Sequence, residues 1–383
     1  MNRVYYLSEV YVNCVAQKRE ERVRAQTEHI SEVEMMKHYV AYVASYTLED
    51  KYGIRVYDVD LLNGRLVEKE KVKISNSSYL TISKNLKFLY SITDSGVNSF
   101  AIAPNGMLTL LNKRSINGMR GCYLSTDYTN SYLFVAGYHD GKLTVLRLLE
   151  DGSIGEITDE VYHKGQSSLA DKNIRPHITC ARVTRDNHYL LVSDQGMDHV
   201  AVYQFDETNG KVRRIDIIRC ALNADPKHIR VSQDGRFVYI LNEQKCDVDV
   251  YSYREENSLP VFDKIQNIPT LETKEDHNSL ACTLKFSADY RYMLSSNTSD
   301  NSVVVYEVSA ENGCLHKQFI LPVSGDYPKD VSLFPNNEFL VSLNHESNSM
   351  TFFRVNFERD FMIQNGSPIA IPHPNCIIFN EVS

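Results

Sequence analysis

Hydrophobic and polar positions alternate along most of the chain, in short runs separated by turn dipeptides. In the stretch DPKHIRVSQDGRFVYILNE, residues 225–243, two alternating runs are joined at Asp234-Gly235. A period of two, with turn residues about every ten positions, is typical of antiparallel strands. The pattern therefore predicts a hairpin here.

This frame of 19 residues recurs along the sequence. Further copies occupy residues 76–94, 120–138, 177–195, 280–298 and 327–345. Each copy is followed by a third alternating run, such as VAVYQF from Val200, and most then continue through a turn such as Asn209-Gly210 into a more polar fourth run. Each unit is thus a four-stranded meander of roughly 50 residues, the length of a propeller blade.

A seventh copy is divided between the two ends of the chain. HPNCIIF, residues 373–379, matches the first strand of the frame, whereas AYVASY, residues 41–46, matches the second and GIRVYDVD from Gly53 the third. Pairing the C-terminal strand with the N-terminal blade would close the ring and remove two exposed sheet edges. We therefore expect an all-β, seven-bladed β-propeller over residues 38–383, closed in this way.

Residues 1–37 contain no copy of the frame. They have no continuous apolar stretch followed by a small-residue cleavage site, which a secretory signal would require. Met35 and Met36 stand just before the repeat begins. We expect an N-terminal extension outside the fold, either a genuine arm or a segment upstream of a true start at one of these methionines.

Composition narrows the class of protein. The chain has 383 residues and a net charge of −8, which argues against nucleic acid as the main partner. No apolar run approaches the ~18 to 20 residues of a membrane span, so no membrane association is expected. The eight cysteines show no C-x-x-C spacing, which in a chain of this size indicates reduced thiols and a cytoplasmic location.

The hairpin geometry of a blade predicts a polar site at one mouth of the central channel. The first strand begins, and the second ends, on the same rim, so Lys227 and His228 should lie beside Glu243. Around the ring, the third frame position is occupied by Ser78, Cys122, Thr179, Lys227, Cys282, Lys329 and Asn375. The fourth is occupied by Tyr79, Tyr123, Cys180, His228, Thr283, Asp330 and Cys376. The last is occupied by Tyr46, Asp94, Tyr138, Gln195, Glu243, Thr298 and His345.

The stretch DPKHIRVSQDGRFVYILNEQKCDVDVY resembles the lactonase family of seven-bladed propellers, which includes 6-phosphogluconolactonase-like and carboxymuconate-cyclase-like proteins. The family pattern there reads P-R-H, D-G-K, V-x-N-E-L and T-V-x-V-Y. RPHITCARVTRDNHYLLVSDQGMDHVAVYQFD, YVASYT, VAGYHDG and IPHPNCIIF match as well, so the resemblance runs from about Tyr39 to the end. It implies a lactone hydrolase without a cofactor, acting on a small anionic sugar lactone, foremost 6-phosphogluconolactone in the pentose phosphate pathway.

The resemblance also implies which residues act. The family's proposed active residues fall on His177, Glu243 and Lys227, where Lys227 replaces an arginine. A neutral His177 or His228 could activate water, and Glu243 could orient that imidazole or act as the base. Candidate contacts to the substrate, with lysines for its phosphate and developing oxyanion, are Lys227, Lys329, Tyr138, Tyr46 and Asn242.

Three positions depart from the family pattern. Thr179 stands where relatives often have a second histidine, and Thr283 and Lys285 stand where they have an acid and a histidine. These departures keep a second hypothesis open, a non-catalytic propeller that binds a small anionic ligand or a protein partner on its rim.

Structural roles are the alternative for several of these residues. His228 could bond a neighbouring loop, and Asn242 could cap a turn, because Asn297 and Asn344 share its frame position. The cysteines near the starts of first strands are expected to be small buried hydrophobes, with no metal, at positions Cys122, Cys180, Cys282 and Cys376.

Overall fold

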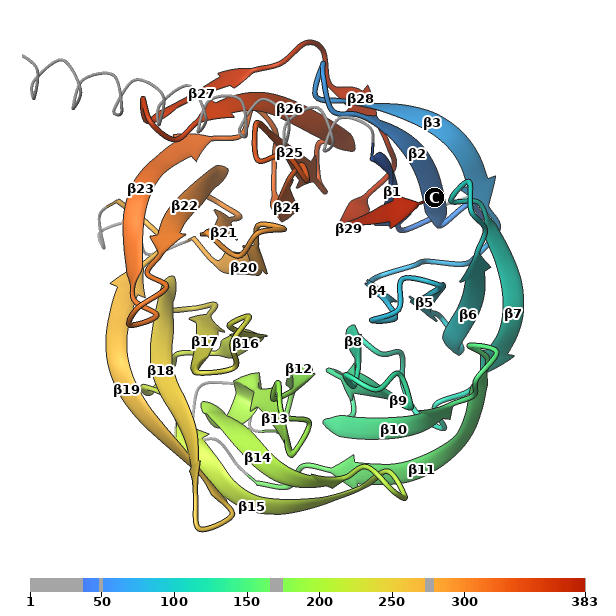
Figure 1. Cartoon of the computed structure of the whole chain (residues 1–383), viewed down its shortest axis with the longest axis vertical. Coiled ribbons are helices and arrows are strands. Elements are labelled where there is room, and N and C mark those ends of the chain that lie inside the picture. Colours follow the sequence, from blue (N-terminus) through green and yellow to red (C-terminus); the bar gives the residue numbers. More distant parts are fainter. Residues whose placement is uncertain (1–36, 48–50, 166–174, 273–278, 383) are drawn as a thin grey trace, which may run out of the picture.

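The computed structural model describes residues 37–47, 51–165, 175–272 and 279–382, and these form seven antiparallel sheets around a central channel (Figure 1). The seven-bladed propeller predicted from the repeat is therefore confirmed. The first strand of the ring starts at His38, and residues 1–36 of the predicted extension lie outside the described residues.

Each blade is a sheet of strands that, except in blade one, follow one another directly along the chain. Blade one comprises β1 (His38–Ser45), β2 (Ile54–Asp60), β3 (Arg65–Val72) and the C-terminal β29 (Pro374–Val382). Blades two and three comprise β4 (Leu80–Ile82), β5 (Phe88–Thr93), β6 (Gly96–Ile102), β7 (Leu108–Arg114), and β8 (Tyr123–Thr126), β9 (Tyr132–Gly137), β10 (Lys142–Leu148), β11 (Ile154–Tyr162). Blades four and five comprise β12 (Ile178–Val183), β13 (Tyr189–Asp194), β14 (His199–Asp206), β15 (Lys211–Arg219), and β16 (Pro226–Val231), β17 (Phe237–Asn242), β18 (Asp247–Glu256), β19 (Leu259–Pro269). Blades six and seven comprise β20 (Ala281–Phe286), β21 (Tyr292–Asn297), β22 (Ser302–Val308), β23 (Leu315–Pro322), and β24 (Pro328–Leu333), β25 (Phe339–Asn344), β26 (Ser349–Asn356), β27 (Phe361–Gln364), β28 (Ile369–Ala370).

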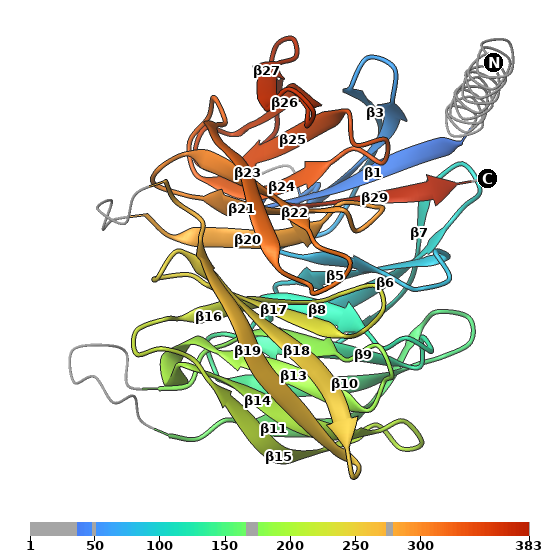
Figure 2. The same cartoon turned by 60° about the vertical axis from the view of Figure 1, so that its left-hand side comes forward.

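The ring closes as the split repeat predicted. β29 pairs antiparallel with β1 over almost its whole length, in a register that joins Val40 to Asn380 and Ala44 to Cys376. Figures 1 and 2 show the two strands side by side, blue against red. The N-terminal blade would otherwise lack its innermost strand.

Burial decreases from the channel outward. All six residues of β17 are buried, whereas β19, the outermost strand of the same blade, alternates between exposed and partly buried positions. Inner strands are covered by neighbouring blades on both faces, so they are nearly continuous in apolar residues, and outer strands have one face in water. This gradient explains why the fourth run of each repeat is the most polar.

Turn residues and tyrosines connect one blade to the next. Gly152 has a φ of +81°, and a Cβ there would lie 2.1 Å from the ring of Phe88 in the adjacent blade, so only glycine fits. The buried hydroxyl of Tyr239 donates to the carbonyl of Gly313 at 2.8 Å, which satisfies a turn carbonyl across a blade boundary. Tyr239 thus joins blade five to blade six.

In the described part of the chain the one helical element is the 3-10 turn η1 (Gln195–Met197). No helix there is long and apolar enough to cross a membrane.

Candidate functional site

Bulges in the first strands direct consecutive side chains toward the channel. Pairing between β16 and β17 passes from Pro226 directly to His228, so Lys227 is an extra residue without a partner in the ladder. In the same way, Thr179 in β12 and Lys329 in β24 have no partner in the strand ladder. A bulge interrupts the alternation of a strand and re-aims the extra side chain. Lys227 and His228 can therefore both line the channel although they are neighbours in sequence.

The channel mouth holds a cavity of about 230 Å³. This is smaller than the ~300 to 1,000 Å³ of pockets for drug-sized molecules, and it suits one small polar ligand. All seven residues of the third frame position line it, namely Ser78, Cys122, Thr179, Lys227, Cys282, Lys329 and Asn375. Other frame positions contribute Tyr46, Tyr79, Tyr138, Gln195, His228, Thr283 and Asp330.

The charge of the cavity is opposite to that of the whole chain. Three cationic side chains, Arg120, Lys227 and Lys329, line it against one carboxylate, Asp330. Outside the lining, Asp94 lies 3.6 Å from Arg120 and Glu243 pairs with Lys227, whereas Lys285 pairs with Asp330. The chain as a whole carries a net charge of −8. The excess of cations at the mouth therefore creates a local site for an anion.

Buried cations continue along the first strands beyond the cavity. Arg230, two residues after His228 and hence on the same side of β16, is only 6% exposed. Its guanidinium donates to the hydroxyls of Tyr123 at 3.2 Å and Tyr79 at 3.4 Å and to the carbonyl of Ile229 at 2.9 Å. Within the described ranges no carboxylate pairs with it. An unpaired buried charge is costly, and an anion in the adjacent cavity would reduce that cost.

Lys227, which lines the cavity, meets Glu243, which lies just outside the lining, as the hairpin geometry predicted. The Lys227 ammonium pairs with one carboxylate oxygen of Glu243, and the Gln195 amide donates to the other. The two ion-pair side chains are 18% and 11% exposed. Burial alone lowers the pKa of Lys227, but Cys282 and the Glu243 carboxylate outweigh it, so that pKa is raised above its usual value and the amine stays charged.

His228 is held in one tautomer. Its Nδ1 accepts the backbone N–H of Leu284 at 3.2 Å, so in the neutral ring the proton lies on Nε2. Burial, followed by the charges of Arg230 and Lys227, lowers the pKa of His228 well below its usual value. A neutral ring with its proton on Nε2 donates a hydrogen bond, so this geometry favours His228 as a donor to an oxyanion rather than as the base.

His177 lies behind the cavity wall. Its ring stacks on the ring of Tyr138 with centroids 4.3 Å apart, and its Nδ1 donates to the Tyr138 carbonyl at 2.8 Å. The remaining lone pair is therefore on Nε2, which is buried and has no hydrogen-bond partner among the described residues. His177 does not line the cavity, and it reaches the site through Tyr138.

Asn242 is also outside the cavity lining. It is 1% exposed, and its amide donates to the carboxylate of Asp247 at 2.8 Å. This arrangement fits the structural role that its frame position suggested. Tyr46 and Tyr138, by contrast, line the cavity.

Two of the residues that depart from the family pattern, Thr283 and Lys285, form a network around Asp330, whereas the Thr179 hydroxyl contacts Ser193 and the Pro226 carbonyl. Thr283 donates to Asp330 Oδ1 at 2.9 Å, and the Lys285 ammonium lies 2.5 Å from Oδ2. The backbone N–H of Ile377 donates to the same oxygen at 2.9 Å. Where relatives have an acid and a histidine in blade six, this chain has Thr283 and Lys285, and both bind the Asp330 carboxylate of blade seven.

Sequence reasoning missed Arg120. Its guanidinium donates to the Asn76 carbonyl at 2.6 Å and lies over the ring of Tyr46, 4.5 Å from the centroid. Arg120 occupies the first position of its frame, the position that singled out His177 in another copy. Reading that position around the whole ring would have found it.

A second polar cluster lies in blade four and next to it. It consists of His163, Asp194 and His199, each of which could offer one ligand atom to a metal ion. Among the described residues this is the one group of three such side chains whose ligand atoms all lie within 4.8 Å of one another. The cysteines considered from the sequence do not belong to it, and the cluster was not expected.

Comparison with known proteins agrees with this picture. The family model "Lactonase, 7-bladed beta-propeller" matches residues 40–379. The chain belongs to this family. This protein is therefore an enzyme of the lactone-hydrolase class, and the cation-lined cavity lies in a lactonase fold.

Individual relatives are more distant. The chain is 28% identical over 350 residues to a 6-phosphogluconolactonase of Bacillus subtilis, covering 90% of this chain and 99% of that protein. It is 26% identical over 319 residues to a 6-phosphogluconolactonase of Formosa agariphila, covering 80% and 89% of the two chains. Among solved structures, the periplasmic gluconolactonase of Pseudomonas aeruginosa superposes with a TM-score of 0.83 at 24% identity, covering 90% of this chain and all of that one. At this identity the structural likeness shows the fold alone.

Proposed function

We propose that this lactonase hydrolyses 6-phosphogluconolactone to 6-phosphogluconate, a step of the pentose phosphate pathway. The observation that carries the proposal is the cavity in which three cationic side chains face one carboxylate in an otherwise acidic protein. A phosphorylated sugar lactone brings a dianion at one end and a reactive carbonyl at the other. The names of the relatives from Bacillus subtilis and Formosa agariphila support the same substrate.

Substrate binding is assigned to the cations at the rim. Lys329 contacts the ring of Tyr327 and has no ion-pair partner among the described residues, so it is available for a phosphate. Arg120 offers a planar guanidinium already oriented by the Asn76 carbonyl and Tyr46. Arg230 adds a fixed positive potential beneath the cavity. Together these groups favour the anionic end of the lactone.

The chemical step is assigned to the residues of blade five at the mouth. Water attacks the lactone carbonyl carbon, and Glu243 takes the proton of that water. The Nε2–H of His228 stabilises the oxyanion that forms, and the ammonium of Lys227 holds the lactone carbonyl oxygen from substrate binding onward. The bond from the carbonyl carbon to the ring oxygen then breaks, and the ring oxygen takes the proton held by Glu243 and becomes the new hydroxyl. Gln195 holds Glu243 in place, and His177 supports Tyr138 from behind.

A direct assay tests the proposal. Purified protein is mixed with freshly prepared 6-phosphogluconolactone, and the loss of lactone is followed against spontaneous hydrolysis. Wild-type protein is expected to accelerate the loss, and Glu243→Gln is expected to lower kcat by about 10²- to 10⁴-fold, the usual contribution of a general base. Glu256→Gln, at the exposed end of β18, is the matched control and should keep full activity.

Two outcomes would contradict the proposal. No acceleration by the folded wild-type protein would exclude this substrate, and binding of 6-phosphogluconate without turnover would favour the non-catalytic hypothesis. Full activity of Glu243→Gln would remove Glu243 as the base. A cytoplasmic location stays a prediction, to be checked by fractionation, since one structural neighbour is described as periplasmic.

A further inference from the structure

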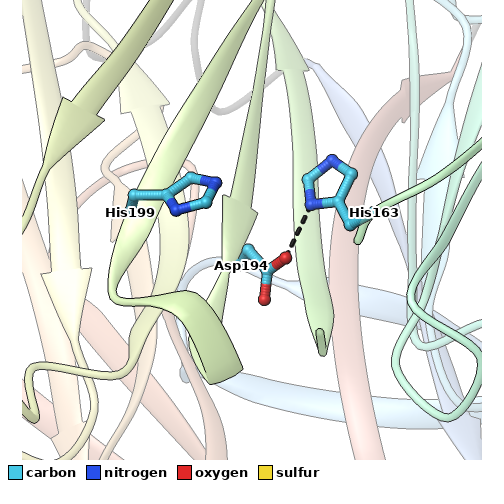
Figure 3. Close-up of side chains that lie close together, drawn as sticks. All are labelled: His163, Asp194 and His199. Atoms are coloured by element: carbon cyan, nitrogen blue, oxygen red, sulfur yellow. Dashed lines mark hydrogen bonds and ion pairs between the residues drawn. The ribbon is translucent and has the colours of Figure 1, made fainter. Parts of the chain in front are cut away.

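A compact cluster of two histidines and one aspartate lies beside the cavity wall. His163 follows β11, Asp194 ends β13, and His199 begins β14. Figure 3 shows the three side chains turned toward one another, with Asp194 between the two rings. Their candidate ligand atoms all lie within 4.8 Å of one another. Asp194 is fully buried and His163 is 8% exposed, whereas His199 is partly exposed and leaves a route for an ion to enter.

Hydrogen bonding explains only part of this cluster. His163 Nδ1 lies 2.6 Å from Asp194 Oδ2, and the hydroxyl of Tyr203 lies 2.8 Å from His163 Nε2. The other carboxylate oxygen of Asp194 accepts the backbone N–H of His177 at 2.9 Å. His199 Nε2, however, is buried and has no hydrogen-bond partner among the described residues. Figure 3 shows its ring pointing into the space beside the other two side chains.

We propose that His163, Asp194 and His199 bind one divalent transition-metal ion of the Zn²⁺ class. Two imidazole nitrogens and one carboxylate oxygen are the ligands that Zn²⁺ accepts, whereas Mg²⁺ and Ca²⁺ prefer sites made of oxygen alone. The ion would give the orphan His199 nitrogen a partner. A fourth position is left for water or another ligand, as in three-residue zinc sites.

The outer contacts of the cluster suit a metal site. A metal-bound histidine normally donates its other ring N–H to a nearby acceptor, and the Tyr203 hydroxyl is placed to accept from His163 Nε2. The carboxylate of Asp194 is fixed by the His177 backbone through the oxygen that would not bind the ion. Both partners are thus in position without the metal.

Binding requires a small rearrangement and a change of tautomer at His163. Metal–ligand bonds of about 2.0–2.2 Å in a tetrahedral site hold the ligand atoms about 3.3 Å apart. The 2.6 Å separation of His163 and Asp194 must therefore widen, while the ring of His199 moves closer. The proton on His163 Nδ1 must move to Nε2, where the Tyr203 hydroxyl can accept it, so that Nδ1 is free to bind the ion.

The experiment uses the full-length chain without a histidine tag, after dialysis against a chelator. Zn²⁺ is titrated by calorimetry, and Co²⁺ is added in a parallel sample for its visible absorption. We expect one ion per chain, Co²⁺ bands typical of a low-coordinate site, and loss of the tight site in His199→Gln. Tyr203→Phe should weaken binding by about 10- to 100-fold, the usual effect of losing an outer contact. His188→Gln alters an exposed histidine paired with Glu255 and should bind like the wild type.

The possible results decide the proposal independently of the lactonase reaction. Absence of one-to-one binding in the wild type, or equal binding by wild type and His199→Gln, would overturn it. Should His199→Gln fail to fold, as judged by circular dichroism, Tyr203→Phe decides, and an unchanged affinity in that variant would overturn the site.

Discussion

The ion pair between Lys227 and Glu243 allows a quantitative prediction for both stability and substrate binding. The pair lies between the extremes of exposed pairs, worth 0 to about 1 kcal/mol, and fully buried pairs, where loss of one partner costs about 3–5 kcal/mol. With side chains 18% and 11% exposed, we expect Lys227→Met or Glu243→Gln each to lower the free energy of unfolding by about 2 kcal/mol. The double variant should lose about the same amount as either single one, because the second change removes a charge already left unpaired.

The expected shift in melting temperature follows from the size of the fold. At about 2.1 cal/mol/K per residue, the unfolding entropy of a propeller of roughly 340 residues makes 1 kcal/mol equal to about 1.4 °C. Each single variant should therefore melt about 3 °C below the wild type. Lys227→Met should also raise KM by about 10- to 150-fold, because a hydrogen bond to a charged group contributes about 1.5–3 kcal/mol.

Thermal melts of the four proteins in the cycle, with steady-state assays, measure these quantities. The exposed pair of Arg147 and Glu156 serves as the control cycle, with an expected coupling below about 1 kcal/mol. Additive losses at Lys227 and Glu243, or an unchanged KM in Lys227→Met, would refute the reasoning that the pair is both coupled and part of the anion site.

Three further predictions concern pH, blade contacts and the rim. Burial depresses the pKa of His228 in the folded chain, whereas an unfolded histidine has a pKa of about 6.5, so at lower pH only the unfolded chain binds this proton. The free energy of unfolding should therefore fall as pH drops from about 7 to 5. In denaturant titrations, His228→Asn should lose less of that free energy than the wild type over the same pH window. Tyr239→Phe leaves the buried carbonyl of Gly313 without its donor and should cost about 1–3 kcal/mol, measured in the same titrations. Arg120→Met removes a cation from the cavity and should raise KM with little change in kcat, as measured by steady-state assays.

Each of these has a matched comparison. Tyr162→Phe changes a half-exposed tyrosine and should leave stability within about 0.5 kcal/mol, and Arg254→Met changes an exposed arginine far along β18 and should leave KM unchanged. An equal pH dependence in His228→Asn, a neutral effect of Tyr239→Phe, or an unchanged KM in Arg120→Met would each contradict the corresponding contact.

The repeat in the sequence predicted the blades because inner strands are covered on both faces and outer ones are not. The alternation and the glycine turns follow from that burial, and the split copy at the two ends implied the pairing of β1 with β29. The meeting of Lys227 and Glu243 followed from hairpin geometry alone. These properties are local or periodic, and a single chain reveals them.

Other features of the site depend on contacts between blades and could not be predicted. The tautomer of His228 depends on the backbone of Leu284 in the next blade, and the partners of Asp330 come from two others. The bulges that turn Lys227 and Lys329 into the channel have no marker in the alternation itself. The cluster of His163, Asp194 and His199 joins residues from two blades whose spacing in the sequence matches no metal motif.

Closure by β29 has a consequence for synthesis of the protein. Because β29 follows all the other described strands in the sequence, blade one stays unfinished and the edge of β1 stays open until residues 374–382 have been translated. A nascent or prematurely terminated product would present this open edge to other polypeptides, and it is at that stage that chaperones would be most needed.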